Sequence, residues 1–456
     1  HPLRDGYWQH GSVSGDWSAI QVPVLAITGW ADAYVNAPPA LAAILTVPAK
    51  AMIGPWEHRY AHIAKLDPAD FHGEVLAWFG KWLKGEETGA EDLPDYRVYM
   101  QEHFGPTKEN KPRKGRWVAE QNWPSPNVTE RVVYLSTGSL TDTAGSGECR
   151  ISNPATVGQA GGYFCPGMRF DNELPGDQAG DDALSACFDT APLEDELQIL
   201  GRPRVRIAFT VDRPVAQIVG RLCDVAPDGS SQRISFRPFN LTHLNGHDAP
   251  EPLVPGQRYE VEFPLNECAH ALRPGHVLRL ALSTSYWPIV WPAPEAAEIM
   301  LDLKDCALIL PERKVSEEIP PEAPGPAQPY PTLGGRQLRA PSGTSETNTL
   351  TDGTLVLDTF DDYGEAVNPH NGMQVGSHVT MHYAIHPDDP ATATFKSDWR
   401  FTFARGDWQV AIDTENRMTC DAQNFYLWRR IHAYEGGASE PVLVKEWSET
   451  VPRGCL

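Results

Sequence analysis

The sequence predicts two parts of different fold class: an α/β part over residues 1–125 and an all-β part over residues 126–456. In the first part, apolar segments of strand length alternate with helical segments, which is typical of a parallel sheet covered by helices. In the second part, short strand-like runs recur between Pro, Gly, Asn and Asp residues, with almost no helical periodicity. Most of the net charge of -22 also lies in the second part, which indicates a different surface.

Four elements are expected in the α/β part. Residues 22–28 form a continuous apolar run, as expected for a strand covered on both faces. Residues 38–45 start with Pro and are rich in Ala and Leu, which suits a helix, and residues 49–53 form a second apolar strand. Residues 71–84 are amphipathic and are followed by a glycine, which is typical of a helix and its C-terminal stop. Two strands are too few for such a sheet, so we expect the sheet to be incomplete in this chain.

The all-β part is expected to form one jelly-roll β-sandwich of the galactose-binding-like type. The alternative is that residues 332–456 form a separate sandwich. Its strands are expected at 131–135, 204–211, 217–224, 259–263, 277–283, 307–310, 354–358, 378–385, 397–405, 408–413, 425–434 and 442–446. A Pro-rich stretch at 319–331 is expected to be an extended insertion within that sandwich.

Composition excludes several classes of partner. A net charge of -22 would repel nucleic acid and an anionic membrane surface, and no apolar run approaches the ~20 residues of a membrane span. None of the eight cysteines forms a C-x-x-C motif, so we expect free thiols, no disulfide framework and a cytoplasmic location. His378, His382 and His386 would lie ~13 Å apart along a strand, too far to share a metal ion. We therefore expect neither a metal site nor a cofactor.

Two chemistry-bearing residues follow the two predicted parallel strands. Asp32 lies just after the first strand, and His58 just after the second. In α/β-hydrolases, the acid and the histidine of the catalytic triad appear in this order on loops after strands. A buried carboxylate fixes the imidazole tautomer, and the histidine then activates a serine hydroxyl. Glu57, next to the histidine, is expected to be a solvated loop charge.

These motifs resemble those of the cocaine esterase and X-Pro dipeptidyl-peptidase family of α/β-hydrolases. The run from Val22 to Asp32 resembles the family's acid strand, and Gly54-Pro55-Trp56-Glu57-His58 resembles its histidine motif. The helix ending at Gly85 and the turn-rich remainder also match, so the resemblance covers essentially the whole chain. It implies that Asp32 is the triad acid and His58 the triad base. Trp30, Tyr34 and Trp56 are candidates for the lining of a substrate pocket, with core packing as the alternative.

One family feature is missing from the sequence. The family's nucleophile is a serine in a G-x-S-x-G motif upstream of the acid strand, and this chain contains no such motif. The nearest string, Gly11-Ser12-Val13-Ser14-Gly15, has Val13 at its centre. Three explanations stay open: a fragment of a longer chain, a two-chain enzyme whose other chain carries the serine, and a pseudoenzyme. The start at His1 without Met fits a cut inside the hydrolase sheet.

The resemblance implies a serine hydrolase that cleaves an ester or amide bond through an acyl-enzyme, with the serine outside this chain. Carboxylesterase, acylase and X-Pro dipeptidyl-peptidase activities stay open, and the substrate would be a small ester, an acyl amide or a short peptide. By this interpretation the chain alone is inactive. The alternative is a non-catalytic β-sandwich that serves for binding or oligomerisation, on a vestigial α/β scaffold. A homodimer and an upstream chain carrying the serine are the expected protein partners.

Overall fold

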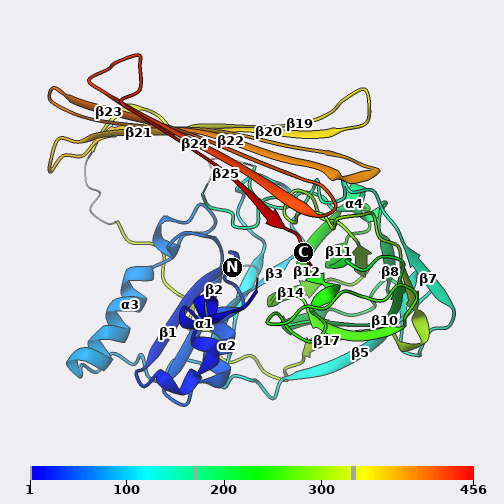
Figure 1. Ribbon diagram of the computed structural model, residues 1–456. Helices are drawn as coiled ribbons and strands as arrows, with labels where there is room; N and C mark the ends of the chain where they lie inside the picture. Colours follow the sequence, from blue (N-terminus) through cyan, green and yellow to red (C-terminus); the bar gives the residue numbers. More distant parts are fainter. Residues whose placement is uncertain (1–2, 169–171, 330–334, 456) are drawn as a thin grey trace.

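We describe the protein from a computed structural model that defines residues 3–168, 172–329 and 335–455. Figure 1 shows an α/β region near the N-terminus in blue, an antiparallel β region in cyan and green, and a layer of long strands in yellow to red. The layer of long strands lies across the other two regions (Figure 1).

The α/β region is built on three parallel strands. β1 (Val24–Ala31), β2 (Ala49–Glu57) and β3 (Tyr96–Glu102) pair in that order, and β4 (Gly115–Glu120) adds antiparallel to β3. The helices are α1 (Gly6–His10), α2 (Ala37–Ile44) and α3 (Phe71–Phe79), and α3 continues into the π-helical turn η4 (Gly80–Lys84). All of β2 is buried, whereas most of β1 is half-buried, as expected for a central strand beside an edge strand.

The predicted alternation of strand and helix is confirmed, but β3 and β4 were not predicted. β3 contains Arg97, a charged residue that does not fit the apolar pattern of a buried parallel strand. The structure accommodates it through an ion pair of 2.7 Å between Arg97 and Glu74 of α3. Arg97 is fully buried, so its pairing depends on a helix that the strand's own sequence does not reveal.

The antiparallel region surrounds a large apolar core formed by residues such as Ile207, Phe209, Leu280 and Leu308. Its elements are β5 (Val128–Ser136), β6 (Ser139–Thr141), β7 (Glu148–Ile151), α4 (Ala179–Asp182), β8 (Ala186–Asp189), β9 (Leu197–Gly201), β10 (Arg204–Val211), β11 (Gln217–Val225), β12 (Ser231–Asn240), β13 (Tyr259–Pro264), β14 (Cys268–Leu272), β15 (Val277–Ser283), β16 (Ile299–Asp302) and β17 (Ala307–Arg313). All six strands expected before residue 311 are present, and the all-β character of this region is confirmed. Its detailed jelly-roll topology stays a prediction.

The last strands form a separate eight-stranded antiparallel sheet. They are β18 (Arg336–Arg339), β19 (Ser342–Thr349), β20 (Leu355–Val367), β21 (Gln374–His386), β22 (Asp389–Arg405), β23 (Trp408–Cys420), β24 (Asn424–Glu435) and β25 (Leu443–Pro452). The expectation of one sandwich over residues 126–456 is therefore wrong beyond residue 335. The reason is that, within the described residues, strands β18 to β25 pair only with one another, and β20 through β25 pair in chain order.

The regions are joined by strand pairing, by the chain connection and by apolar packing. β14 continues the α/β sheet by pairing parallel with β3, at His270 opposite Gln101 and Ala271 opposite Glu102. β4 ends at Glu120 and β5 begins at Val128, so the domain boundary expected at residue 125 falls in a connection. The long-stranded sheet contacts the antiparallel region through a small apolar cluster that includes Trp287 and Ile385.

The Pro-rich stretch has little regular structure in the part that is described. Between residues 319 and 329 it has only an isolated bridge, which joins Pro326 to Ala69, and positions 330–331 lie outside the described residues. All eight cysteines are free thiols. In the described part of the chain, no helix has both the length and the apolar character needed to cross a membrane.

Candidate functional site

Parallel pairing of β1 and β2 brings Asp32 and His58 to the same edge of the sheet. The strands run in register from Val24 opposite Ala49 to Gly29 opposite Gly54, and the register then shifts so that Ala31 lies opposite Glu57. Such a shift in register is typical of a β-bulge, and bulges are over-represented near functional sites. Asp32 follows β1 directly and His58 follows β2 directly, so both side chains lie at the carboxyl ends of the strands.

The two side chains are hydrogen-bonded. His58 Nδ1 lies 3.0 Å from Asp32 Oδ2, and the other carboxylate oxygen accepts a hydrogen bond of 2.9 Å from the backbone N–H of Tyr34. The side chain of Asp32 is 10% exposed and that of His58 is 40% exposed. A fixed, buried carboxylate thus meets a histidine that is still accessible, which is the arrangement by which an acid holds an imidazole in one tautomer.

A loop of the antiparallel region holds the histidine from the other side. The backbone N–H of His58 donates to the carbonyl of Pro166 at 2.8 Å, and Arg59 Nε donates to the carbonyl of Gly167 at 2.9 Å. Gly167 has φ +116°, and a Cβ there would lie 2.9 Å from the backbone nitrogen of His58. The close approach therefore requires glycine at this position.

Glu57 is a structural anchor rather than a solvated charge, so that expectation is wrong. The residue is 1% exposed. Its carboxylate accepts hydrogen bonds from the backbone N–H groups of Lys65 at 2.6 Å and Leu66 at 3.3 Å, and Arg59 lies 3.6 Å away. These donors come from the segment after β2, which folds back over the carboxylate and satisfies it.

His58 opens onto a cavity of about 790 Å³. Apolar side chains of β1 and α3 form much of its wall: Leu25, Ile27, Phe71 and Val75. Met168 of the antiparallel region and Tyr363 of the long-stranded sheet also line it. All three regions of the chain therefore contribute to the surroundings of the histidine.

The three aromatic residues predicted for a pocket occupy different positions. Trp56 lines the 790 Å³ cavity but is only 1% exposed, and its indole N–H donates to the carbonyl of Asp67 at 2.9 Å. Tyr34 is 65% exposed, and its ring centroid lies 5.5 Å from that of His58. Trp30 borders a second, narrower cavity of about 110 Å³ beside Asp32. Tyr34 is the aromatic residue of this set that is both accessible and next to the histidine.

Cys165 is a neighbour that the sequence pattern did not indicate. Its sulfur lies within 4.8 Å of ligand atoms of both Asp32 and His58, and within the described residues these three form the one such group of potential metal ligands. Burial, together with the charge of Asp32, raises the pKa of the Cys165 thiol, although the backbone N–H of Ala33 opposes this. The raised pKa lowers the fraction of thiolate, which is the nucleophilic form of cysteine, whereas Asp32 and His58 are joined by a hydrogen bond of 3.0 Å.

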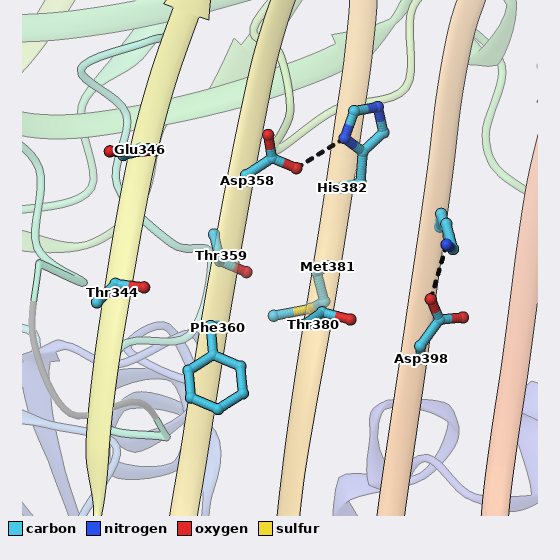
Figure 2. Close-up of a pocket in the computed structure, with 10 residues that line it drawn as sticks. Thr344, Glu346, Asp358, Thr359, Phe360, Thr380, Met381, His382 and Asp398 are labelled. Carbon is cyan, nitrogen blue, oxygen red and sulfur yellow. Dashed lines mark hydrogen bonds and ion pairs between the residues drawn. The ribbon is translucent and has the colours of Figure 1, made fainter.

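A second hollow, of about 530 Å³, lies on the outer face of the long-stranded sheet (Figure 2). His382 Nδ1 lies 2.7 Å from Asp358 Oδ1, and these side chains are 42% and 53% exposed. Figure 2 shows that this hollow is lined by side chains standing on neighbouring strands, among them Thr344 and Phe360. An exposed ion pair contributes little and does not fix its histidine, so this hollow is the weaker candidate.

Comparisons with known proteins show the family of the chain. Residues 88–318 match the family model described as the X-Pro dipeptidyl-peptidase C-terminal non-catalytic domain, and residues 1–60 match that of the X-Pro dipeptidyl-peptidase (S15 family). The chain belongs to the cocaine esterase and X-Pro dipeptidyl-peptidase family of α/β-hydrolases. Both Asp32 and His58 lie within the S15 match, and the long-stranded sheet lies beyond both matches.

Similar proteins are hydrolases of this family. The chain is 23% identical over 318 residues to the cocaine esterase of Rhodococcus sp. (strain MB1 Bresler), a match that covers 63% of this chain and 53% of the esterase. Two solved structures share the fold. An α-amino acid ester hydrolase has a TM-score of 0.57, 18% identity and coverage of 69% of this chain and 59% of that chain. A CocE/NonD family hydrolase of Staphylococcus aureus has a TM-score of 0.52, 12% identity and coverage of 69% and 58%. The chain spans about half the length of the curated relatives it matches.

Proposed function

We propose that this chain is the part of a serine hydrolase that carries the acid and the base of the catalytic triad, while the nucleophilic serine lies outside it. The reaction is hydrolysis of an ester or amide bond through an acyl-enzyme. The observation that carries the proposal is the 3.0 Å contact between His58 Nδ1 and Asp32 Oδ2 at the carboxyl ends of adjacent parallel strands.

In the proposed mechanism, each group has a distinct task that fits its position. Asp32 accepts the hydrogen bond from the Nδ1–H of His58, which leaves Nε2 as the proton acceptor. Among the described residues, none is hydrogen-bonded to Nε2, and His58 lines the 790 Å³ cavity. A serine hydroxyl placed beside Nε2 would lose its proton to His58 as it attacks the carbonyl carbon. His58 would then return the proton to the leaving group, while Asp32 stabilises the imidazolium.

The surface around the Asp32–His58 pair, called the dyad below, supports the proposal that another segment supplies the serine. β1 pairs with β2, and no strand of the described ranges pairs with its other edge. Leu76 on α3 and Leu83 on η4 are 70% and 76% exposed, although they belong to the apolar pattern of that helix. An open strand edge beside exposed apolar helix residues is suited to further strands and helices of the same sheet. That segment is either part of a longer polypeptide or a separate chain.

The substrate we propose is a small ester, an acyl amide or a short peptide. The apolar walls of the cavity suit an acyl group, and its volume of about 790 Å³ is in the range of small-molecule sites. Tyr34 would contact the substrate next to His58. The eight free thiols support a cytoplasmic location for the enzyme.

Labelling with a fluorophosphonate probe tests the proposal, because the probe reacts with an activated serine. We expect no labelling of residues 1–456 alone, and labelling of a polypeptide or complex that includes an upstream G-x-S-x-G segment. In that active form, His58→Ala should lower kcat for a nitrophenyl ester at least 10³-fold. His382→Ala is the matched control, because His382 also pairs with an aspartate but lies on the outer sheet face. Labelling of the chain alone, or full activity of His58→Ala, would refute the proposal.

A non-catalytic role is the second candidate. The observation in its favour is that the family model matching residues 88–318 is described as a non-catalytic domain. In this case the antiparallel region and the outer sheet serve for binding or oligomerisation. Failure of the serine-containing form to react with the fluorophosphonate, despite correct folding, would favour this role.

A further inference from the structure

The outer edge of the long-stranded sheet is an unpaired and exposed strand. β25 (Leu443–Pro452) pairs with β24, and no strand within the described residues covers its other edge. Residues 443–450 are all exposed, including Leu443 at 46%, Val444 at 53% and Trp447 at 47%. An edge of this length presents a row of free backbone N–H and C=O groups, which is a template for another strand.

The sequence of β25 is complementary to itself when two copies run antiparallel. A twofold axis perpendicular to the sheet relates the two copies. Residues opposite each other in an antiparallel pair point to the same face, and this is possible only when the axis passes at one residue rather than between two. With the axis at Trp447, Lys445 of each copy lies opposite Glu449 of the other, and the two tryptophans face each other. Leu443 then lies opposite Val451 on the same face.

Neighbouring registers lack this match. An axis at Glu446 places glutamate opposite glutamate, and an axis at Lys445 places lysine opposite lysine. Like charges directly opposite each other destabilise a strand pair, whereas opposite charges and aromatic pairs stabilise it. A charged edge usually prevents association, but among registers centred within β25 only the one at Trp447 places opposite charges of this strand across from each other, so the charges favour it.

We propose that β25 is a homodimer interface in which two copies pair antiparallel about Trp447. The two eight-stranded sheets then form one continuous sheet, and both α/β regions lie on the same side of it. The other edge of this sheet is less suited to such pairing, because β19 consists largely of Ser, Thr, Gly and Asn. The inference does not depend on the chemistry of Asp32 and His58.

Sedimentation of the chain over a range of micromolar concentrations tests the interface. We expect a monomer–dimer equilibrium, and Lys445→Glu or Glu449→Lys should each raise the dimer Kd about tenfold or more, because each creates two like-charge pairs. The double variant, which exchanges the two charges, should restore dimerisation. Glu440→Lys in the exposed loop before β25 is the control for net charge and should leave the Kd unchanged. A chain that stays monomeric would overturn the proposal.

Cysteine crosslinking tests the register. In the proposed pairing, Trp447→Cys places two thiols directly opposite each other at a Cα separation of about 5 Å, within the range for a disulfide. Mild oxidation with diamide should therefore give a covalent dimer. Lys445→Cys is the matched control, because two copies of position 445 would lie ~13 Å apart. Crosslinking of Lys445→Cys but not of Trp447→Cys would overturn the register.

Discussion

The buried carboxyl group of Glu267 should make the free energy of unfolding of this chain depend on pH. It precedes β14 at the junction of the two regions, and its backbone N–H donates to Asn36 Oδ1 at 2.8 Å. Burial raises the pKa of its carboxyl group from 4.5 to about 7, and the charge of Arg202 opposes this only in part. In the described part of the chain, no group donates a hydrogen bond to this carboxylate, which accounts for the dominance of burial.

The raised pKa fixes the sign of the effect. Between pH 4.5 and pH 7 the folded state keeps the proton of Glu267 while the unfolded state loses it. Its contribution to stability is therefore fully present below pH 4.5 and is lost as the pH rises through 7. At about 1.4 kcal/mol per pH unit, the loss between pH 5 and pH 8 is about 2–3 kcal/mol.

Glu267→Gln removes the ionisation while keeping the size of the side chain. The free energy of unfolding of Glu267→Gln minus that of the wild type should be about 2–3 kcal/mol larger at pH 8 than at pH 5. Urea unfolding followed by tryptophan fluorescence at both pH values measures this difference. Glu440→Gln, in an exposed loop, should follow the wild type at both pH values. A difference between Glu267→Gln and wild type that is the same at pH 5 and pH 8 would refute the reasoning.

Two further substitutions, the second with a matched control, test contacts that hold the site and the core. Gly167→Ala should destabilise the fold by about 1–3 kcal/mol, because its Cβ would meet the backbone of His58; an unchanged melting temperature would contradict this contact. Arg313→Met should lower the free energy of unfolding by about 3–5 kcal/mol. The substitution removes the cation that lies 2.6 Å from the buried Glu120 and leaves this carboxylate without a charged partner. Arg206→Met, at an exposed pair, should cost less than about 1 kcal/mol, and equal losses in the two arginine variants would contradict the role of burial.

The pairing of Asp32 with His58 could be predicted because it follows from local topology. Each residue lies directly after an apolar strand, and parallel strands bring their carboxyl ends to one edge. The expected helices at 38–45 and 71–84 also follow from local periodicity and from the residues at their ends. These features depend on residues that are neighbours in the sequence.

Features that depend on distant residues could not be predicted in this way. From its position after a predicted strand, Glu57 is expected to be an exposed charge in a loop. It is buried because the following segment folds back over it. Cys165 and Gly167 reach the dyad from a loop more than a hundred residues away, and no spacing in the sequence links them to His58. Strand alternation also looks the same in a sandwich and in a separate sheet, so the strands of β20 to β25 gave no sign of which sheet they join.

The candidate site is built from both the α/β region and the antiparallel region, which the sequence predicts as two separate parts. The histidine motif belongs to the α/β region, but the backbone N–H of His58 and the side chain of Arg59 are held by the carbonyls of Pro166 and Gly167. The carboxylate of Glu173 in turn accepts a hydrogen bond of 2.5 Å from the backbone N–H of Gly167. The antiparallel region contributes neither Asp32 nor His58, but its loop fixes the backbone of His58. For this reason the antiparallel region acts on the proposed chemistry through geometry, by fixing the backbone from which the imidazole extends.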